Sequence, residues 1–482
     1  MKWLSCSMVL IGFSTQLFGQ ANSPPERIKE VTLSPNKSSY PALKYELYPS
    51  VLKQHPGNAA LYLHRASAFL PRHFNPTKEW LADQDRVFDI MGTTVASKDD
   101  LKLLKDYLGN ISNILRELEF AAECTDADWG LMERAKTDGI NLLLQEVQYM
   151  RDLANKLRIH ARIQVIEGNI PGALKDIRTG FALGRHTGKH GVLIQHLVGI
   201  AVTSMFLEEL LVVMQHPDCP NLYWALADMP SPFIPISQAF DAERLWIDAA
   251  MPKFQDTIEV LLTKQQATDR LDQYWKEFSQ TMGTNNEYMK MSPAAARLMQ
   301  AGMVIVNLDK SKNSLLKKGY DPKILEKMPP AQVVLVHSML NQRDILDRYF
   351  AAAKLPTSEA QLQLRKIDAE VRNTSGDLDL SAIFVRLLLP SLERVSASNG
   401  RMVRHIESLR AIEAIRLHID STGKIPANLD EVKVVTVPKD PINGKYFDYL
   451  PTENRFQLKV TPPDAQPQNA WNGWTYRVNI RK

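Results

Sequence analysis

Helical spacing of apolar residues dominates the chain from Tyr40 to about Val395 and limits the folds that are open to it. Apolar residues recur there at intervals of three and four, which is the period of an amphipathic helix. The breaks fall at clusters of Pro, Gly and Asn, such as 55–58 and 229–232, and no convincing run of alternating strand residues interrupts the pattern. The sequence therefore predicts a mainly α protein with an irregular helical-hairpin body over residues 40–397.

Two segments of this body resemble parts of tetratricopeptide repeats. In the first, residues 54–70, four residues recur at helical intervals just after Pro56, as in the first helix of such a repeat: Tyr62, Arg65, Ala66 and Phe69. In the second, residues 157–185, the small residues Ala161 and Ala173 flank a Gly168-Asn169 turn, and small residues let paired helices approach closely. The second segment is similar to the helix-turn-helix arrangement of a tetratricopeptide repeat. The distance from Ala66 to Ala161 is not a multiple of the tetratricopeptide period, so we expect degenerate hairpins rather than a regular array.

The most apolar internal segment, Val192–Met214, is expected to be a buried core helix. Polar residues interrupt it at Gln195, His196, Glu208 and Glu209. The uninterrupted stretch, 197–207, is too short to cross a bilayer, which needs about 20 apolar residues. Charged side chains would also be costly in lipid. The sequence therefore predicts no membrane span in the mature chain.

The character of the chain changes near Asn399-Gly400, where we place the start of a small α+β module, residues 398–482. A helix from about 401 to 420 is followed by Gly423, a residue type that commonly ends helices. The segment 440–444, Asp-Pro-Ile-Asn-Gly, has strong turn chemistry. Three stretches then alternate as strands do: 446–450, 456–460 and 474–480. A helix on a short antiparallel sheet is the simplest arrangement that buries these faces.

Two stretches of the chain carry a family resemblance. Ser408–Tyr449 contains a helix followed by Gly-Lys-Ile-Pro, Val-Pro-Lys-Asp-Pro and Gly-Lys-Tyr-Phe, and Asn221–Phe233 reads NLYWALADMPSPF. Both stretches resemble segments of a family of uncharacterised exported proteins of planctomycete bacteria. The resemblance implies a bacterial, exported protein and implies no particular activity.

The N-terminal residues have the layout of a secretory signal peptide. Lys2 precedes an apolar run, Trp3–Phe13, and small residues stand at the −3 and −1 positions for cleavage after Ala21. The run is roughly half of the length that crosses a bilayer, so we expect removal rather than a retained anchor. We therefore predict export to the periplasm or the exterior, with residues 1–21 removed and residues 22–39 forming a flexible segment.

Composition and charge narrow the classes of partner. At 44% hydrophobic and 23% charged residues, the chain has the composition of an ordinary globular protein, and its length predicts more than one domain. The chain has 58 basic and 54 acidic residues, and removal of residues 1–21 takes away one Lys, which leaves a net charge of about +3. Nucleic-acid binding needs a dense basic surface, so we expect no nucleic-acid partner.

The mature chain keeps two cysteines, Cys124 and Cys219. An oxidising compartment would permit a disulfide between them, which could stabilise the fold by about 4 kcal/mol through loop closure. Two isolated cysteines also fit two buried free thiols. The sequence leaves both alternatives open.

Compact catalytic signatures are missing from the mature sequence. It contains no His-Glu-x-x-His pair, no Cys-x-x-Cys and no Gly-x-Ser-x-Gly elbow. The segment Gly184–Lys189 is similar to a phosphate-binding loop, but it is one residue short, and His190 stands where Ser or Thr would bind magnesium. We therefore expect no cofactor, and the sequence assigns no residue a catalytic role.

His186 and His190 are weak candidates for a metal site. Imidazoles one helical turn apart can share an ion, but Gly188 and Gly191 argue against a continuous helix here, and no third ligand follows at a fixed spacing. We therefore predict no bound metal. Acidic pairs such as Glu208-Glu209 could act as an acid and a base only if the two carboxylates converged across a cleft.

These observations favour a cell-envelope binding or scaffold protein that holds a protein or peptide partner on a helical-hairpin surface. The alternative is an envelope hydrolase whose site is assembled from helical loops. The missing catalytic signatures favour a protein without enzymatic activity but do not decide the question. The sequence leaves the oligomeric state open.

Overall fold

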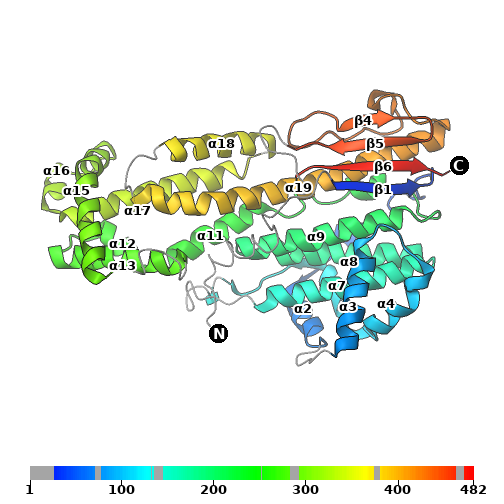
Figure 1. Cartoon of the computed structure of the whole chain (residues 1–482), viewed down its shortest axis with the longest axis horizontal. Coiled ribbons are helices and arrows are strands. Elements are labelled where there is room, and N and C mark those ends of the chain that lie inside the picture. The colour runs from blue at the N-terminus through cyan, green and yellow to red at the C-terminus, as the bar shows by residue number, and fades with distance from the viewer. Residues whose placement is uncertain are drawn as a thin grey trace. The chain divides into compact units, whose positions relative to one another are not determined.

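The structure is a computed structural model that describes residues 27–70, 77–131, 133–134, 145–250, 252–282, 292–355, 357–373, 380–462 and 472–481. It is mainly helical, with a four-stranded sheet built largely from C-terminal residues (Figure 1). The predicted mainly α class is confirmed. The predicted signal peptide, residues 1–21, lies outside the described residues.

The chain forms two compact units. Of the described residues, unit 1 contains 130–134 and 240–396. Unit 2 contains 27–129, 145–239 and 397–481. The chain passes from one unit to the other at Trp129–Gly130 and also within two helices, α11 (Ile236–Ala250) and α19 (Leu380–Thr422).

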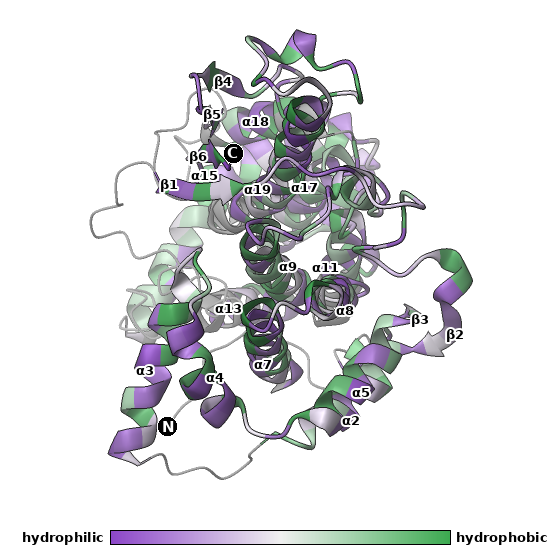
Figure 2. Ribbon diagram, turned by 90° about the vertical axis from the view of Figure 1, so that its right-hand side faces the viewer, coloured by the Kyte–Doolittle hydropathy of each residue, from purple (hydrophilic) through white to green (hydrophobic). Residues whose placement is uncertain are grey.

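The helical part of unit 2 is a set of packed hairpins. Its helices are α2 (Ala59–Ser67), α3 (Lys78–Gly92), α4 (Leu101–Leu108), α5 (Ser112–Ala122), α7 (Gln145–Ile166), α8 (Ile170–Gly188), α9 (Leu193–Met214) and α10 (Tyr223–Ala227). Among them lie the short 3-10 helices η1 (Val51–Lys53), η2 (Lys98–Asp100) and η4 (Leu429–Glu431), and the parallel strand pair β2 (His55–Asn58) and β3 (Cys124–Asp126). The helices α7, α8 and α9 pack against one another, and Figure 2 shows that they are rich in hydrophobic residues.

The helical hairpin predicted around Gly168-Asn169 is present as α7 and α8. Gly168 has a φ of 78°, a left-handed conformation that glycine adopts without strain. Asn169 then begins α8, because its side chain accepts a hydrogen bond from Gly172 N at 3.2 Å. Ala161 and Ala173 are fully buried, as expected of small residues between paired helices.

The segment expected to be a core helix forms α9. By length and composition this helix could cross a membrane, but 72% of its most apolar window is buried inside the protein, and the core helix of a soluble protein passes the same test. Its polar residues Gln195, His196 and Glu209 are buried with it. The packing of α9 against α7 and α8 therefore accounts for its hydrophobicity.

Glycines allow α8 and α9 to cross at close range. A Cβ atom on Gly199 of α9 would lie 2.6 Å from Gly184 O and 2.7 Å from Gly188 Cα. A Cβ atom on Gly180 would lie 2.3 Å from the ring of Phe206. Gly184 and Gly188, which belong to the segment that is similar to a phosphate-binding loop, therefore lie inside α8. Their four-residue spacing places both on the side of α8 that packs against α9.

Unit 2 also contains a four-stranded sheet in the order β1-β6-β5-β4. Its strands are β1 (Arg27–Leu33), β4 (Asp448–Pro451), β5 (Arg455–Val460) and β6 (Trp474–Ile480). The last three coincide closely with the three predicted strands and pair antiparallel, as expected. Phe456, Leu458 and Tyr476 are fully buried on the inner face, which confirms the alternation seen in the sequence.

The strand β1 contradicts the prediction of a flexible segment over residues 22–39. It pairs in parallel with β6, from Arg27 opposite Trp474 to Leu33 opposite Ile480. Its inward positions are Lys29, Val31 and Leu33, and all three are buried. A lysine at an inward position obscures the alternation that would otherwise mark this segment as a strand.

The predicted domain boundary at residue 398 falls inside α19. This helix continues through Asn399-Gly400, and Gly423, with a φ of 71°, follows its end as predicted. A glycine inside a helix costs only about 1 kcal/mol, which packing on both sides can offset. Val395, Met402 and Ile406 are buried around the Asn-Gly pair, so the helix is not interrupted.

The predicted module, residues 398–482, is also not separate from the helical body, because its described residues share unit 2 with much of that body. Asn221 Nδ2 donates a hydrogen bond to Glu413 O at 2.8 Å, and Leu222 N donates to Glu413 Oε2 at 2.7 Å. Arg416, which is fully buried, donates from Nε to Ser34 O at 3.1 Å. These buried contacts are what join the C-terminal residues to the hairpins.

Unit 1 is helical in its described part. Its helices are α12 (Pro252–Glu259), α13 (Lys264–Met282), α15 (Pro293–Lys317), α16 (Pro322–Lys327), α17 (Pro330–Ala352) and α18 (Thr357–Asn373). The helix α17 contacts α12, α13, α15 and α18. Two apolar clusters lie along it, one containing Trp275 and Met303 and the other containing Leu315 and Leu325.

Candidate functional site

The two weak metal candidates lie in different environments. His186 is inside α8 and 1% exposed, and burial, with the charges of Lys189 and Arg185, lowers its pKa to about 4. His190 follows the helix with a φ of 55°, and its Nε2 lies 2.9 Å from Asp126 Oδ1. Among the residues that the structure describes, no group of three His, Cys, Asp or Glu side chains is placed to hold a metal ion.

Cys124 and Cys219 are both buried free thiols, so the structure contains no disulfide between them. Cys124 Sγ lies 3.7 Å from His55 Nε2 and donates to Phe120 O at 3.4 Å. Burial raises the pKa of the Cys219 thiol to about 12. Cys219 is therefore a protonated, unreactive side chain at neutral pH.

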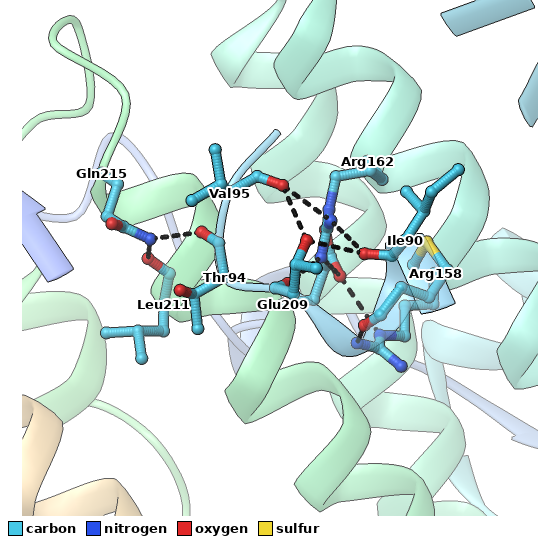
Figure 3. Close-up of polar contacts among 10 residues, drawn as sticks. Ile90, Thr94, Val95, Arg158, Arg162, Glu209, Leu211 and Gln215 are labelled. Carbon is cyan, nitrogen blue, oxygen red and sulfur yellow. Dashed lines mark hydrogen bonds and ion pairs between the residues drawn. The ribbon is translucent and has the colours of Figure 1, made fainter. Parts of the chain in front are cut away.

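Glu208 and Glu209 are neighbours on α9 but belong to two different clusters. Glu209 is fully buried, and its carboxylate accepts hydrogen bonds from Arg162 Nε at 2.6 Å and from Arg158 Nε at 3.1 Å. Figure 3 shows both guanidinium groups, which come from α7, beside this carboxylate. The two adjacent carboxylates therefore do not converge on one site.

The same arginines hold the loop that follows α3. Arg162 donates from Nη1 to Ile90 O and from Nη2 to Thr93 O, both at 3.2 Å. Gln215 Nε2 donates to Thr94 O at 2.5 Å from the far end of α9 (Figure 3). Because these donors are used by backbone carbonyls of the chain itself, we interpret the cluster as a structural fastening of residues 90–95.

Glu208 belongs to a cluster between β1, α9 and α19. Lys29 Nζ donates to Glu208 Oε1 at 2.7 Å and lies 3.3 Å from His405 Nε2. The rings of Trp474 and Tyr476 flank the ammonium, with centroids 5.8 Å and 5.2 Å from Nζ. Three polar groups from three distant segments therefore meet at one point.

Burial and charge set the protonation states in this cluster. Burial alone acts to raise the pKa of Glu208, but the Lys29 ammonium, with His405 and Arg27, lowers it to about 2. Burial lowers the pKa of His405 to about 3, and the charge of Lys29 adds to the effect. Burial also lowers the pKa of Lys29, while Glu208 acts in the opposite direction. At neutral pH the cluster thus holds an ionised carboxylate and a neutral imidazole.

This cluster is largely shielded from solvent. Lys29 is 5% exposed and His405 is 7% exposed, and aromatic rings cover the ammonium, whereas the Glu208 side chain is 22% exposed. An active site assembled from separate segments would need such a convergence of polar groups together with access for a substrate. Because the buried Lys29 ammonium holds the Glu208 carboxylate, we interpret the two as a partly buried ion pair that fixes β1 to α9.

The α2–α5 hairpin is open to solvent on one side. Asn58 begins α2, because its Oδ1 accepts from Ala60 N at 3.0 Å and from Asp128 N at 2.9 Å. Leu63 and Ala66 are then fully buried, and α2 packs against α5. Helical spacing places Leu61, Tyr62 and Arg65 on the outer side, away from Leu63 and Ala66. In Figure 2 the ribbons of α2 and α5 contain both hydrophobic and hydrophilic residues.

We call the following outer residues of this hairpin and its immediate C-terminal turn the α2–α5 surface: Leu61, Tyr62, Arg65, Phe69 and Phe120. Leu61 is 63% exposed, Phe69 is 49% exposed and Phe120 is 46% exposed. Large apolar side chains that gather in solvent, with Tyr and Arg among them, are typical of a site that binds another protein.

Arg65 is held in place on this surface. Its Nη2 donates to Glu117 Oε1 at 3.0 Å, and its guanidinium carbon lies 5.7 Å from the ring centroid of Tyr62. The Tyr62 ring lies 5.8 Å from that of Phe120. The Arg65 side chain is nevertheless 63% exposed. An ordered side chain loses less conformational entropy when a partner binds, and Arg and Tyr are frequent energetic anchors of interfaces.

Part of this surface could be predicted from the sequence. Tyr62, Arg65 and Phe69 share a predicted helix, and their spacing places them opposite the buried positions Leu63 and Ala66. Their spacing alone does not mark them as a binding surface. Phe120 could not be added from the sequence, because nothing local to that residue indicates that α5 lies beside α2.

No family model, no curated protein and no solved structure matches this chain. The resemblance to exported planctomycete proteins therefore stays an expectation from the sequence. Any statement about function depends on the geometry described above.

Proposed function

We propose that this protein is an exported binding protein of the cell envelope that holds a protein or peptide partner on the α2–α5 surface. The observation that carries the proposal is the exposure of Leu61, Phe69 and Phe120 around an ordered Arg65. The two polar clusters on α9 support it indirectly. Most of their side chains are buried, and the carboxylates of Glu209 and Glu208 are engaged within the protein by Arg162 and Lys29.

The chemistry of the surface indicates the kind of partner. Leu61, Phe69 and Phe120 offer apolar contacts, and Arg65 offers guanidinium donors between them. Arg116 lies one helical turn before Phe120 on α5, and its side chain is 59% exposed. Its Nη2 lies 3.8 Å from Glu117 Oε1. The surface suits a segment that carries apolar side chains and a neighbouring carboxylate, because a carboxylate can accept two hydrogen bonds from one guanidinium group.

The test compares partner capture by matched variants. The purified wild-type protein, the double variant Leu61→Asp/Phe120→Asp and the control Leu450→Asp are immobilised and exposed to an envelope extract. Leu450 is also apolar and 58% exposed but lies on β4. Circular dichroism first establishes that all three proteins are folded.

We expect wild type and the control to retain the same partner and the double variant to lose it. Titration calorimetry with the purified partner should then show at least a tenfold weaker Kd for the double variant, since anchor residues of an interface contribute more than about 1 kcal/mol each. Equal capture by all three proteins would leave the α2–α5 surface without a role in binding.

Export is the second part of the proposal and depends on the layout of residues 2–21. Mass spectrometry of the native protein should find an N-terminus near Asn22 in an envelope or medium fraction. An intact Met1 on protein recovered from the cytoplasm would refute this part and would leave the binding surface to be tested by itself.

A further inference from the structure

The helix α15 of unit 1 presents apolar residues to solvent and amides to the interior. Its inner side includes three buried polar residues, Gln300, Asn307 and Ser311. On its outer side Leu298 and Ile305 are each 76% exposed, and Val306 is 61% exposed. Side chains of this kind are ordinarily buried, so their gathering on one outer face indicates a surface that is covered by a partner.

Two small, exposed residues form the centre of this outer face. Ala301 and Gly302 lie between the exposed Leu298 and Ile305, and both are exposed. A Cβ atom added to Gly302 would meet nothing within 4 Å. A second helix can therefore approach the backbone of α15 closely at this point.

Two exposed residues of the outer face, Leu298 and Ile305, lie at equal distances in sequence on the two sides of the peptide bond between Ala301 and Gly302. The counterpart of Val306 is Arg297, so the symmetry is confined to Leu298, Ile305 and the two small residues between them. A surface with this symmetry is complementary to itself when a second copy is turned by a half rotation, which aligns the two helices antiparallel. Leu298 of one copy then packs against the partner's Ile305, and the reverse contact forms as well.

The charges on the outer face fit the antiparallel alignment. Arg297 lies before the apolar residues and Asp309 after them, both are exposed, and neither makes an ion pair with the residues that the structure describes. Antiparallel helices bring Arg297 within one helical turn of the partner's Asp309, and the pair occurs twice. Parallel helices would bring Arg297 level with the partner's Arg297 and leave the partner's Asp309 twelve residues away, so this pair of opposite charges would not form.

We propose that two copies of this chain associate through α15, with their outer faces antiparallel about a two-fold axis beside Ala301 and Gly302. A single pair of helices buries less than the roughly 800 Å² per partner that is usual for a stable interface. The dimer is therefore weak, with a Kd on the order of tens of micromolar. This proposal is independent of the α2–α5 surface, so either can fail without the other.

Cysteine cross-linking tests the geometry. In the antiparallel dimer the two copies of residue 301 are about one residue apart along the helix axis, whereas the two copies of residue 313 are about 35 Å apart. Ala301→Cys should therefore form a disulfide-linked dimer under mild oxidation, and Asn313→Cys, also exposed on α15, should not. The experiment uses protein that begins at Asn22 and therefore lacks Cys6; its native Cys124 and Cys219 are buried, so the background reaction is low.

The other outcomes of the cross-linking experiment would contradict the antiparallel dimer. Linkage of both variants would indicate parallel helices, and linkage of neither would overturn the dimer. Co-sedimentation with lipid vesicles that depends on Ile305, in the absence of any cross-link, would mean that a membrane surface covers the face and would overturn the proposal as well.

Exchanging the charges of Arg297 and Asp309 tests the proposed dimer without an oxidant. Sedimentation equilibrium of the full chain should show that Arg297→Asp and Asp309→Arg each weaken the dimer at least fivefold, and that the double variant restores it. Ile305→Asp should abolish it. A wild-type protein that remains monomeric up to about 200 µM, at least several times the expected Kd, would refute the inference.

Discussion

Three of the buried histidines of unit 2, His186, His196 and His405, should make the protein less stable as the pH falls below about 6.5. His186, His196 and His405 are 1%, 0% and 7% exposed. Burial is the largest cause of their shifts and lowers the pKa to about 4 for His186, about 4 for His196 and about 3 for His405. In the folded protein all three are therefore neutral at mildly acidic pH.

The sign of the effect follows from proton binding. An unfolded histidine has a pKa of about 6.5, so the unfolded chain takes up three protons that the folded protein refuses. The stability contribution is complete above pH 6.5 and is lost as the pH falls toward the folded pKa values. At pH 5.5 each histidine costs a little over 1 kcal/mol, and the three together cost about 4 kcal/mol. This is a large share of the 5–15 kcal/mol that stabilises an ordinary domain.

Two other titrating groups, Glu208 and His160, do not contribute to this loss of stability below pH 6.5. The pKa of Glu208 is lowered to about 2, so its contribution is lost only below its unfolded value of about 4.5. The hydrogen bond to Asp176 raises the pKa of His160. His160 therefore stabilises the fold most below its unfolded pKa and loses this contribution as the pH rises, so it does not add to the acid instability.

The assay is urea unfolding at pH 7.5, 6.5, 5.5 and 5.0, followed by circular dichroism. His196→Gln should reduce the pH dependence between 6.5 and 5.0 by about a third, since one of three titrating groups is removed. His64→Gln, which changes an exposed histidine on α2, is the matched control and should leave the slope unchanged. A free energy of unfolding that is flat from pH 7.5 to 5.5, or an unchanged slope in His196→Gln, would refute the reasoning.

Two further predictions concern packing and buried charge. Gly199→Ala should destabilise the protein by about 2–3 kcal/mol, because the added Cβ atom lies 2.6 Å from Gly184 O, whereas Gly302→Ala meets nothing and should stabilise α15 by about 0.5–1 kcal/mol. Thermal melts of the two variants should move in opposite directions, and equal shifts would contradict the close crossing of α8 and α9. Glu209→Gln should cost about 3–5 kcal/mol in urea, because two guanidinium groups lose a buried counter-charge, and a loss below about 1 kcal/mol would count against the cluster.

The mainly α class and the C-terminal strands were predictable because their signals are local. Phe456 and Leu458 alternate with polar residues, and β5 pairs with strands that are close in sequence. The strand β1 was not predictable in this way. Among the strands that the structure describes it pairs only with β6, and Lys29 is tolerated on its inner face because Glu208, on a distant helix, neutralises it.

The α2–α5 surface could likewise be predicted only in part. Tyr62 and Arg65 could be placed on one helix from spacing alone, but Phe120 joins them through the packing of α2 on α5, which local sequence does not encode. The four-residue spacing of Gly184 and Gly188 does carry a helix-packing signal. A Cβ atom on Gly199 would lie 2.6 Å from Gly184 O and 2.7 Å from Gly188 Cα, so these glycines are needed where α8 and α9 cross.

The pairing of β1 with β6 also has a consequence for how the chain reaches its native state. Glu30 and Arg477 form a cross-strand ion pair although they are 447 residues apart in sequence. Closing such a loop costs about 2 kcal/mol more entropy than closing a crossover of about 30 residues. Contacts of this range also slow folding. During synthesis β1 leaves the ribosome early and has no strand to join until nearly the whole chain has been made, so unit 2 completes its sheet only after translation has passed residue 480.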